Sequence, residues 1–122
     1  MIKKEQRDIW LMHAPFSNYS ETKVRPVVII SHNSYNRNTE DFIAVHITTR
    51  KEHPYMISLS QNDFVNGKLQ DESVVRFDTV TRYNENLLLQ KIGKVKPEFY
   101  LKTYQKIIEL IQSNKINETY IT

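Results

Sequence analysis

The sequence predicts a mainly β (α+β) protein that ends in one long helix. Short runs of β-branched and other apolar residues recur as far as Thr79, and they are bounded by polar, turn-forming segments. After Pro97 the pattern changes to an apolar stripe with three- and four-residue spacing, which is typical of a helix. With 122 residues the chain is expected to form a single domain, with a core over 7–112 and a tail over 113–122.

The first two strands are expected over 8–13 and 27–30, where short apolar runs occur. Pro26 cannot donate to a sheet ladder, so it should lie at the beginning of its strand or on an edge. It also holds Arg25 extended, with its side chain directed outward. The polar segment over 15–23 is longer than a tight hairpin requires, which makes it a candidate functional loop.

A turn-rich connector is expected over 33–40, followed by a strand over 42–49. Alternation in this strand places three aliphatic residues on one face: Ile43, Val45 and Ile47. His46 and Thr48 then stand side by side on the other, less apolar face.

Two further strands are expected over 55–59 and 71–78, with an Asn-Gly turn signal at 66–67 between them. The last of these strands is unusual because Arg76 and Asp78 interrupt its apolar residues. Both charged side chains point to the same face, with their Cα atoms about 7 Å apart.

One or two helical turns are expected over 85–90, ending near Gly93. The long helix should begin at Pro97, because proline favours the first helical position, and continue to about Gln112. Its apolar stripe, which we expect to pack on the sheet, consists of Tyr100, Leu101, Tyr104, Ile107, Ile108 and Ile111.

Composition excludes several classes of function. The chain has no cysteine, which removes disulfides, thiol catalysis and cysteine-ligated zinc. Its four histidines match no zinc-binding spacing, so we expect neither a metal nor another cofactor. No apolar run is long enough to span a membrane, and the polar start does not resemble a signal peptide, so a cytoplasmic protein is expected. A net charge of +3 weakly favours an anionic partner such as nucleic acid.

Arg76 and Asp78 allow two interpretations. As an exposed ion pair they would contribute at most about 1 kcal/mol to stability. As a functional pair, the guanidinium would stabilise charge on a phosphoryl group while the carboxylate accepts a proton. The neighbouring arginine lowers the pKa of such a carboxylate, however, which makes it a weak base at neutral pH. Asp78 could therefore serve only to orient Arg76.

The other candidates also have structural alternatives. Arg25 could be a solvated charge, Thr48 an ordinary strand residue and His46 a structural histidine rather than an acid or base. Aromatic residues interleaved with cations would suit unpaired bases, or could simply pack against the fold. These residues are Phe16, Tyr19, Tyr35, Tyr55 and Tyr83, with Lys23, Arg37, Arg50, Lys51 and Arg82.

Taken together, several segments resemble the MazF/PemK (Kid) toxins of type II toxin–antitoxin modules, which are messenger-RNA endoribonucleases. The matching segments occur in family order across residues 7 to 112. They are Arg7-Asp8-Ile9-Trp10-Leu11, Arg25-Pro26-Val27-Val28-Ile29-Ile30-Ser31, Tyr35-Asn36-Arg37, Ile47-Thr48-Thr49, Asp71-Glu72-Ser73-Val74-Val75-Arg76-Phe77-Asp78 and Leu89-Gln90-Lys91-Ile92-Gly93.

This resemblance implies a small, strongly bent antiparallel β-barrel with a short helix and a long C-terminal helix, as in the gyrase poison CcdB. It implies a homodimer, a cognate antitoxin with which the toxin binds DNA, and a single-stranded RNA substrate. Cleavage would be metal-independent and sequence-specific, with the 2′-hydroxyl attacking phosphorus to leave a 2′,3′-cyclic phosphate.

By position, the resemblance assigns catalytic roles to Arg25, Thr48, Arg76 and Asp78. RNA contacts are expected from Tyr19, Glu21, Lys23, Asn36, Arg37, His46 and Arg82. The main alternative is a non-catalytic barrel of the same class that binds RNA or a protein, as a gyrase poison does. A structural dimerisation barrel without a ligand is a third interpretation, and the outward-facing charges disfavour it.

Overall fold

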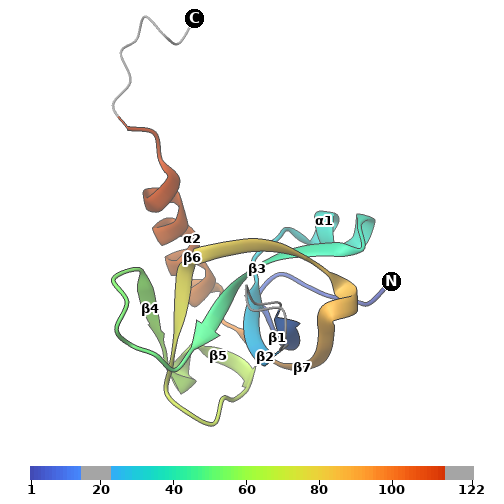
Figure 1. Cartoon of the computed structure of the whole chain (residues 1–122), viewed down its shortest axis with the longest axis horizontal. Coiled ribbons are helices and arrows are strands. Elements are labelled where there is room, and N and C mark those ends of the chain that lie inside the picture. Colours follow the sequence, from blue (N-terminus) through green and yellow to red (C-terminus); the bar gives the residue numbers. More distant parts are fainter. Residues whose placement is uncertain (15–22, 115–122) are drawn as a thin grey trace, which may run out of the picture.

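The computed structural model describes residues 1–14 and 23–114. In this part of the chain seven strands form one antiparallel sheet in the order β4-β6-β3-β2-β1-β7-β5 (Figure 1). The strands are β1 (Asp8–Ala14), β2 (Lys23–Ile29), β3 (Asp41–Thr48), β4 (Met56–Leu59), β5 (Phe64–Gly67), β6 (Ser73–Asn84) and β7 (Leu88–Val95). The helices are α1 (Asn33–Asn38) and α2 (Pro97–Ile111), with single 3₁₀ turns η1 (Gln61–Asp63) and η2 (Glu85–Leu87).

The sheet curls into a half-barrel around its main core. Ile57 of β4 and Phe64 of β5 come from strands at opposite ends of the sheet, yet both belong to one buried cluster with Val45 and Val75. Only a strongly bent sheet can bring its two ends together in this way. Phe99 from the first turn of α2 completes the cluster. The predicted bent antiparallel fold with a C-terminal helix is thus confirmed.

A second, smaller core lies on the other face of the central strands. It contains Met12, Val27, Phe42, Ala44 and Leu88, and it is extended by the partly buried Trp10, Tyr83 and Leu87. Ala44 belongs to this core whereas Val45 belongs to the main one, as the predicted alternation along β3 requires. The side chains of His46 and Thr48 follow Ala44 on the same face.

The segment over 33–40, expected to be a turn-rich connector, instead contains the short helix α1. The Nδ1 atom of His32 accepts a hydrogen bond from the Ser34 N–H and so caps its first turn. Asn36 anchors the helix from inside the fold, because its amide donates to the Ser31 carbonyl oxygen and its side-chain oxygen accepts from the Ser31 hydroxyl. These contacts favour a helix that the polar composition does not reveal.

The region over 85–90 was expected to be helical, but only η2 is, and β7 follows it without a break at Gly93. The expected turn at 66–67 is likewise the end of β5, which pairs with β7. Gly67 has a φ of +83°, and a Cβ atom added to Gly93 would lie 2.7 Å from the Asn66 carbonyl oxygen. The two glycines therefore allow these strands to approach closely rather than end them.

Helix α2 begins at Pro97 as predicted, but most of its apolar stripe does not pack on the sheet. Phe99 and Thr103 are its buried residues. Leu101, Tyr104, Ile108 and Ile111 are between 42% and 69% exposed. The sequence pattern identified an apolar face correctly but not what covers it. No helix in the described residues is long and apolar enough to cross a membrane.

A buried ion pair ties the N-terminal segment to η2. The side chain of Lys4 is fully buried, and its ammonium group lies 2.8 Å from Glu85 Oε2. The same ammonium donates to the carbonyl oxygens of Asn36 at 2.8 Å and Thr39 at 3.1 Å. All three of its N–H donors are therefore used, which connects the N-terminus, α1 and η2 around one charge.

Candidate functional site

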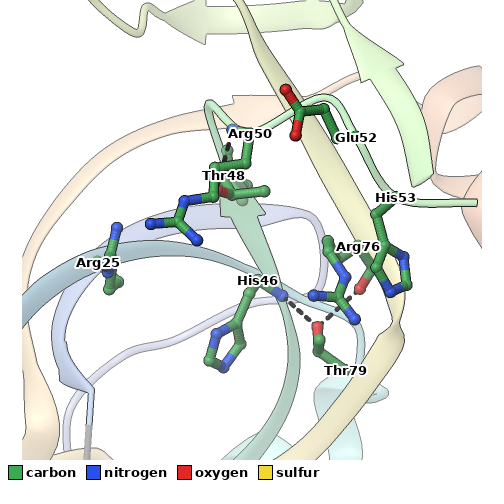
Figure 2. A pocket seen from close by; sticks show the side chains of 9 residues that line it. Arg25, His46, Thr48, Arg50, Glu52, His53, Arg76 and Thr79 are labelled. Carbon is green, nitrogen blue, oxygen red and sulfur yellow. Dashed lines mark hydrogen bonds between the residues drawn. The ribbon is translucent and has the colours of Figure 1, made fainter. Parts of the chain in front are cut away.

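Strands β2, β3 and β6 together form an open cleft of about 510 Å³ on the face that carries the second core. We call it the central cleft. Five of its residues come from these strands and bear polar side chains: Arg25, His46, Thr48, Arg76 and Thr79 (Figure 2). Ile47, Arg50, Glu52 and His53 complete its lining. The structure thus brings together three of the four predicted catalytic residues in one place.

Arg25 and Thr48 meet because the β2–β3 ladder ends beside Pro26. The ladder ends with the pair Val27 and His46, and the same antiparallel register places Arg25 opposite Thr48. Pro26 still pairs with Leu11 of β1, but it has no N–H to offer toward β3. The loss of pairing at this point lets the cleft open between the two side chains.

Arg76 and Asp78 form a bidentate ion pair, as their shared face predicts. Nε of Arg76 lies 3.1 Å from Oδ1 of Asp78, and Nη2 lies 2.7 Å from Oδ2. The hydrogen bonds from Arg76 hold the pKa of Asp78 below its usual value. Asp78 is therefore an ionised carboxylate with both oxygens engaged. It is suited to fixing the guanidinium and poorly suited to accepting a proton.

His46 lies directly opposite Arg76 in the β3–β6 ladder. Its Nε2 is 2.6 Å from the Tyr83 hydroxyl, and the two rings lie 5.8 Å apart. Burial lowers the pKa of His46, and the charges of Arg25 and Arg76 lower it further. The imidazole is consequently neutral at physiological pH, with its ring at the border between the second core and the central cleft.

An irregularity in the β3–β6 ladder lies next to His46. The register shifts between Ala44 and His46, and the side chain of Thr79 takes the place of a missing ladder bond. The Thr79 hydroxyl oxygen accepts from the His46 N–H at 2.9 Å and donates to the Arg76 carbonyl oxygen at 2.7 Å (Figure 2). Bulges of this kind occur next to active sites, where they re-aim side chains.

Sequence reasoning missed part of the cleft lining. Glu52 and His53 follow Thr48 closely in the chain and line the same cleft, although they were not predicted as site residues. Arg50 lines it too, and the sequence had indicated it only as one of the cations that would suit unpaired bases. Nε2 of His53 lies 3.8 Å from Oδ2 of Asp78. The signal available in the sequence was the run of charged and titratable residues immediately after Thr48.

Several predicted RNA contacts lie away from the central cleft. Lys23, Arg37 and Arg82 are exposed, but they are not among its lining residues. Asn36 is only 2% exposed, and its amide donates a hydrogen bond to the Ser31 carbonyl oxygen. Tyr19 and Glu21 lie outside the described residues.

The electrostatics of the cleft suit a phosphate group. Three guanidiniums, from Arg25, Arg50 and Arg76, face one open volume, while Glu52 is the single carboxylate in its described lining. Guanidiniums bind phosphate oxygens through paired N–H donors, and the Thr48 hydroxyl can add another donor. No group of three or more metal-ligating residues occurs in the described ranges 1–14 and 23–114.

Comparisons with known proteins agree with this architecture. A family model described as the PemK-like, MazF-like toxin of type II toxin–antitoxin systems matches residues 5–111. Among curated proteins, no sequence matches this chain.

Solved structures show the same fold. One is an endoribonuclease in complex with its cognate antitoxin from a mycobacterial species, with 20% identity and a TM-score of 0.71 over 95% of this chain and 100% of that chain. A crystal structure of MazF from Deinococcus radiodurans has 18% identity and a TM-score of 0.71, covering 93% of this chain and 100% of the other. A MazE–MazF structure from the same organism has 16% identity and a TM-score of 0.73 with the same coverage.

Proposed function

Because the chain belongs to the PemK-like, MazF-like toxins of type II toxin–antitoxin systems, we propose that it is a sequence-specific endoribonuclease that cleaves single-stranded messenger RNA. One observation carries the proposal: Arg25 and Arg76 reach into the same cleft from two strands, with Thr48 between them in the sheet. A phosphodiester in this cleft would have a cation on either side. The solved structures that resemble this chain include proteins named endoribonucleases.

The proposed reaction is attack of the ribose 2′-hydroxyl on the adjacent phosphorus. This attack concentrates negative charge on the non-bridging oxygens, where Arg25, Arg76 and the Thr48 hydroxyl can stabilise it. The products are a 2′,3′-cyclic phosphate and a 5′-hydroxyl. Since the guanidiniums supply the positive charge, the reaction requires no metal ion. Asp78 holds Arg76 in position through both of its oxygens.

The test is cleavage of single-stranded RNA in excess EDTA, with both new ends mapped. We expect cutting at a defined sequence, with a cyclic phosphate on the upstream fragment. An otherwise identical oligonucleotide with one 2′-deoxyribose at the cleavage position should bind but stay intact, because the attacking hydroxyl is missing. Cleavage of that substrate, or cleavage only with added divalent metal, would contradict the mechanism. Failure to cut any RNA would favour a barrel that only binds a partner, as gyrase poisons do.

We further propose a cognate antitoxin protein as a partner. Four of the solved structures that resemble this chain contain such a complex, one with a cognate antitoxin and three with MazE. The three guanidiniums of the central cleft would favour an acidic antitoxin segment over a basic one.

The proposed homodimer has a candidate contact on α2. Leu101, Tyr104, Ile108 and Ile111 are exposed and follow one another at spacings of three, four and three residues. This spacing produces one apolar seam along the helix, of the kind that packs against a second helix. A second copy of the chain offers an identical seam, so the two helices can pair around a twofold axis.

Replacing Ile108 with glutamate should shift the protein from dimer to monomer, because a carboxylate in the seam would have to be desolvated on pairing. Light scattering coupled to gel filtration measures the mass directly. Lys106→Gln is the matched control, since it changes the net charge by the same amount at an exposed position on the opposite face of α2. Equal masses for both variants and the wild type would exclude this seam as the dimer contact.

A further inference from the structure

We propose that His46 is the general base of the RNA cleavage reaction, and that Tyr83 is a positioning residue that holds the imidazole ready for proton transfer. This inference rests on the proposed endoribonuclease function and adds a step to it. The assignment replaces Asp78 as the proton acceptor.

The position of His46 suits a base. It is held from three sides: Arg76 lies opposite it in the ladder, Thr79 accepts its backbone N–H at 2.9 Å, and Tyr83 contacts Nε2 at 2.6 Å. In Figure 2 its ring lies between Arg25 on one side and Arg76 with Thr79 on the other. A phosphodiester held by the two guanidiniums would therefore have an imidazole beside it.

Tyr83 occupies one of the two ring nitrogens of His46. The Tyr83 ring packs against Phe42, with centroids 5.9 Å apart, which fixes the hydroxyl at Nε2. Burial raises the pKa of Tyr83, so the phenol stays protonated. When Nε2–H donates to the phenol oxygen, the lone pair of the neutral imidazole is on Nδ1. Nδ1 has no hydrogen-bond partner among the described residues, so it is open to a ribose hydroxyl.

The two candidate bases differ in their protonation chemistry. Both oxygens of Asp78 are engaged by Arg76, and the lowered pKa of Asp78 makes it a weak base. His46 also has a lowered pKa, but from an ordinary value near neutrality, so it is mostly neutral in the cell and close to the range that base catalysis favours. The titratable and charged groups that face it are Arg25 from β2, Arg76 and Tyr83 from β6, and Arg50, Glu52 and His53 around the cleft.

The step balances as follows. Nδ1 of His46 takes the proton of the 2′-hydroxyl while the 2′-oxygen forms its bond to phosphorus. The bond between phosphorus and the 5′-oxygen breaks, and that oxygen leaves with the electron pair and takes a proton from water. The imidazolium then returns its proton to solvent, which regenerates the neutral base.

The first experiment compares the pH dependence of kcat for the wild type and His46→Gln, with an RNA that the wild type cuts. We expect the wild-type rate to fall with acid through a pKa below about 6.5, because protonated His46 cannot accept a proton. His46→Gln should lose about 100-fold in kcat, keep KM and lack this acid limb. Tyr83→Phe should lower kcat by about fivefold to tenfold with KM unchanged, from the loss of one hydrogen bond. The matched control, Tyr100→Phe, removes a hydrogen-bonded tyrosine hydroxyl outside the cleft.

A second substrate separates base from acid catalysis. Replacing the bridging 5′-oxygen by sulfur gives a leaving group that departs without a proton. His46→Gln should remain about 100-fold slow on this substrate if the histidine is the base. Recovery of the wild-type rate there would overturn the assignment and make His46 the acid. A fully active His46→Gln with an unchanged acid limb would also overturn it, while leaving the proposed function intact. Failure of the wild type to cut any RNA would instead refute the proposed function itself.

Discussion

Arg76→Ala should reduce RNA cleavage by about 100-fold to 1,000-fold, and Arg25→Ala should do the same. Each guanidinium faces the central cleft and is expected to stabilise charge that develops on the phosphate in the transition state. The loss should appear mainly in kcat when cleavage of a defined oligonucleotide is followed under saturating and single-turnover conditions. Thermal unfolding should change little, because neither side chain belongs to a core cluster.

Three further variants make this result interpretable. Lys102→Ala removes an exposed cation of α2 outside the cleft and should keep full activity. Asp78→Asn should cost less than Arg76→Ala if the carboxylate only positions Arg76. Arg76→Lys keeps the positive charge but cannot donate two parallel hydrogen bonds as a guanidinium does, so its activity should lie between those of Arg76→Ala and the wild type. Wild-type rates in both alanine variants would exclude the proposed site.

Lys4→Ala should lower the free energy of unfolding by about 3 to 5 kcal/mol. The substitution removes the ammonium group that pairs with Glu85 and satisfies the carbonyl oxygens of Asn36 and Thr39. Glu85 would remain 6% exposed with no cation beside it. Urea unfolding followed by circular dichroism measures the loss, and Lys3→Ala is the control because that lysine is exposed.

The loss of unfolding free energy caused by Lys4→Ala should depend on pH. In the wild type the hydrogen bond from Lys4 holds the pKa of Glu85 below its usual value, so the pair's contribution is present at neutral pH and lost as pH falls through that lowered pKa. In the variant, burial favours the neutral acid instead. The difference in unfolding free energy between the wild type and Lys4→Ala should therefore become smaller as the pH is lowered. A deficit below about 1 kcal/mol at neutral pH would mean that the pair contributes no more than an exposed one.

The sequence was sufficient to predict the face on which the site lies. Alternation placed His46 beside Thr48 and Arg76 beside Asp78, and the structure keeps both relations. It could not predict that β2, β3 and β6 would be neighbours, because strand order depends on long-range pairing. The identification of one site from Arg25 and Arg76 therefore depended on the family resemblance.

Other differences arise where tertiary contacts override local patterns. Asparagine is typical of a turn or a polar surface, but Asn36 is held in the interior by two hydrogen bonds. Its side-chain amide donates to the Ser31 carbonyl oxygen, and its own carbonyl oxygen accepts from the buried Lys4 ammonium. Gly93 is typical of a helix end, yet it lies within a strand because β5 passes close to it. The stripe on α2 predicts a buried face, and no local signal distinguishes a face covered by the sheet from one left open.

The irregular pairing beside Thr79 determines which side chains can share the cleft. From His46 to Ala44 is two steps along β3, whereas their partners Arg76 and Thr81 are five steps apart along β6. Strand β6 therefore has three extra residues at this point, and an odd number of extra residues reverses which side chains face each side of the sheet. As a result Tyr83 and Arg76 point to the same face, although they are seven residues apart and would lie on opposite faces of a regular strand. Inserting or deleting one residue over 77–80 would turn Tyr83 away from His46 and leave Arg76 in place. Natural length variation at this point should therefore occur in steps of two wherever this pair of aromatic rings is retained.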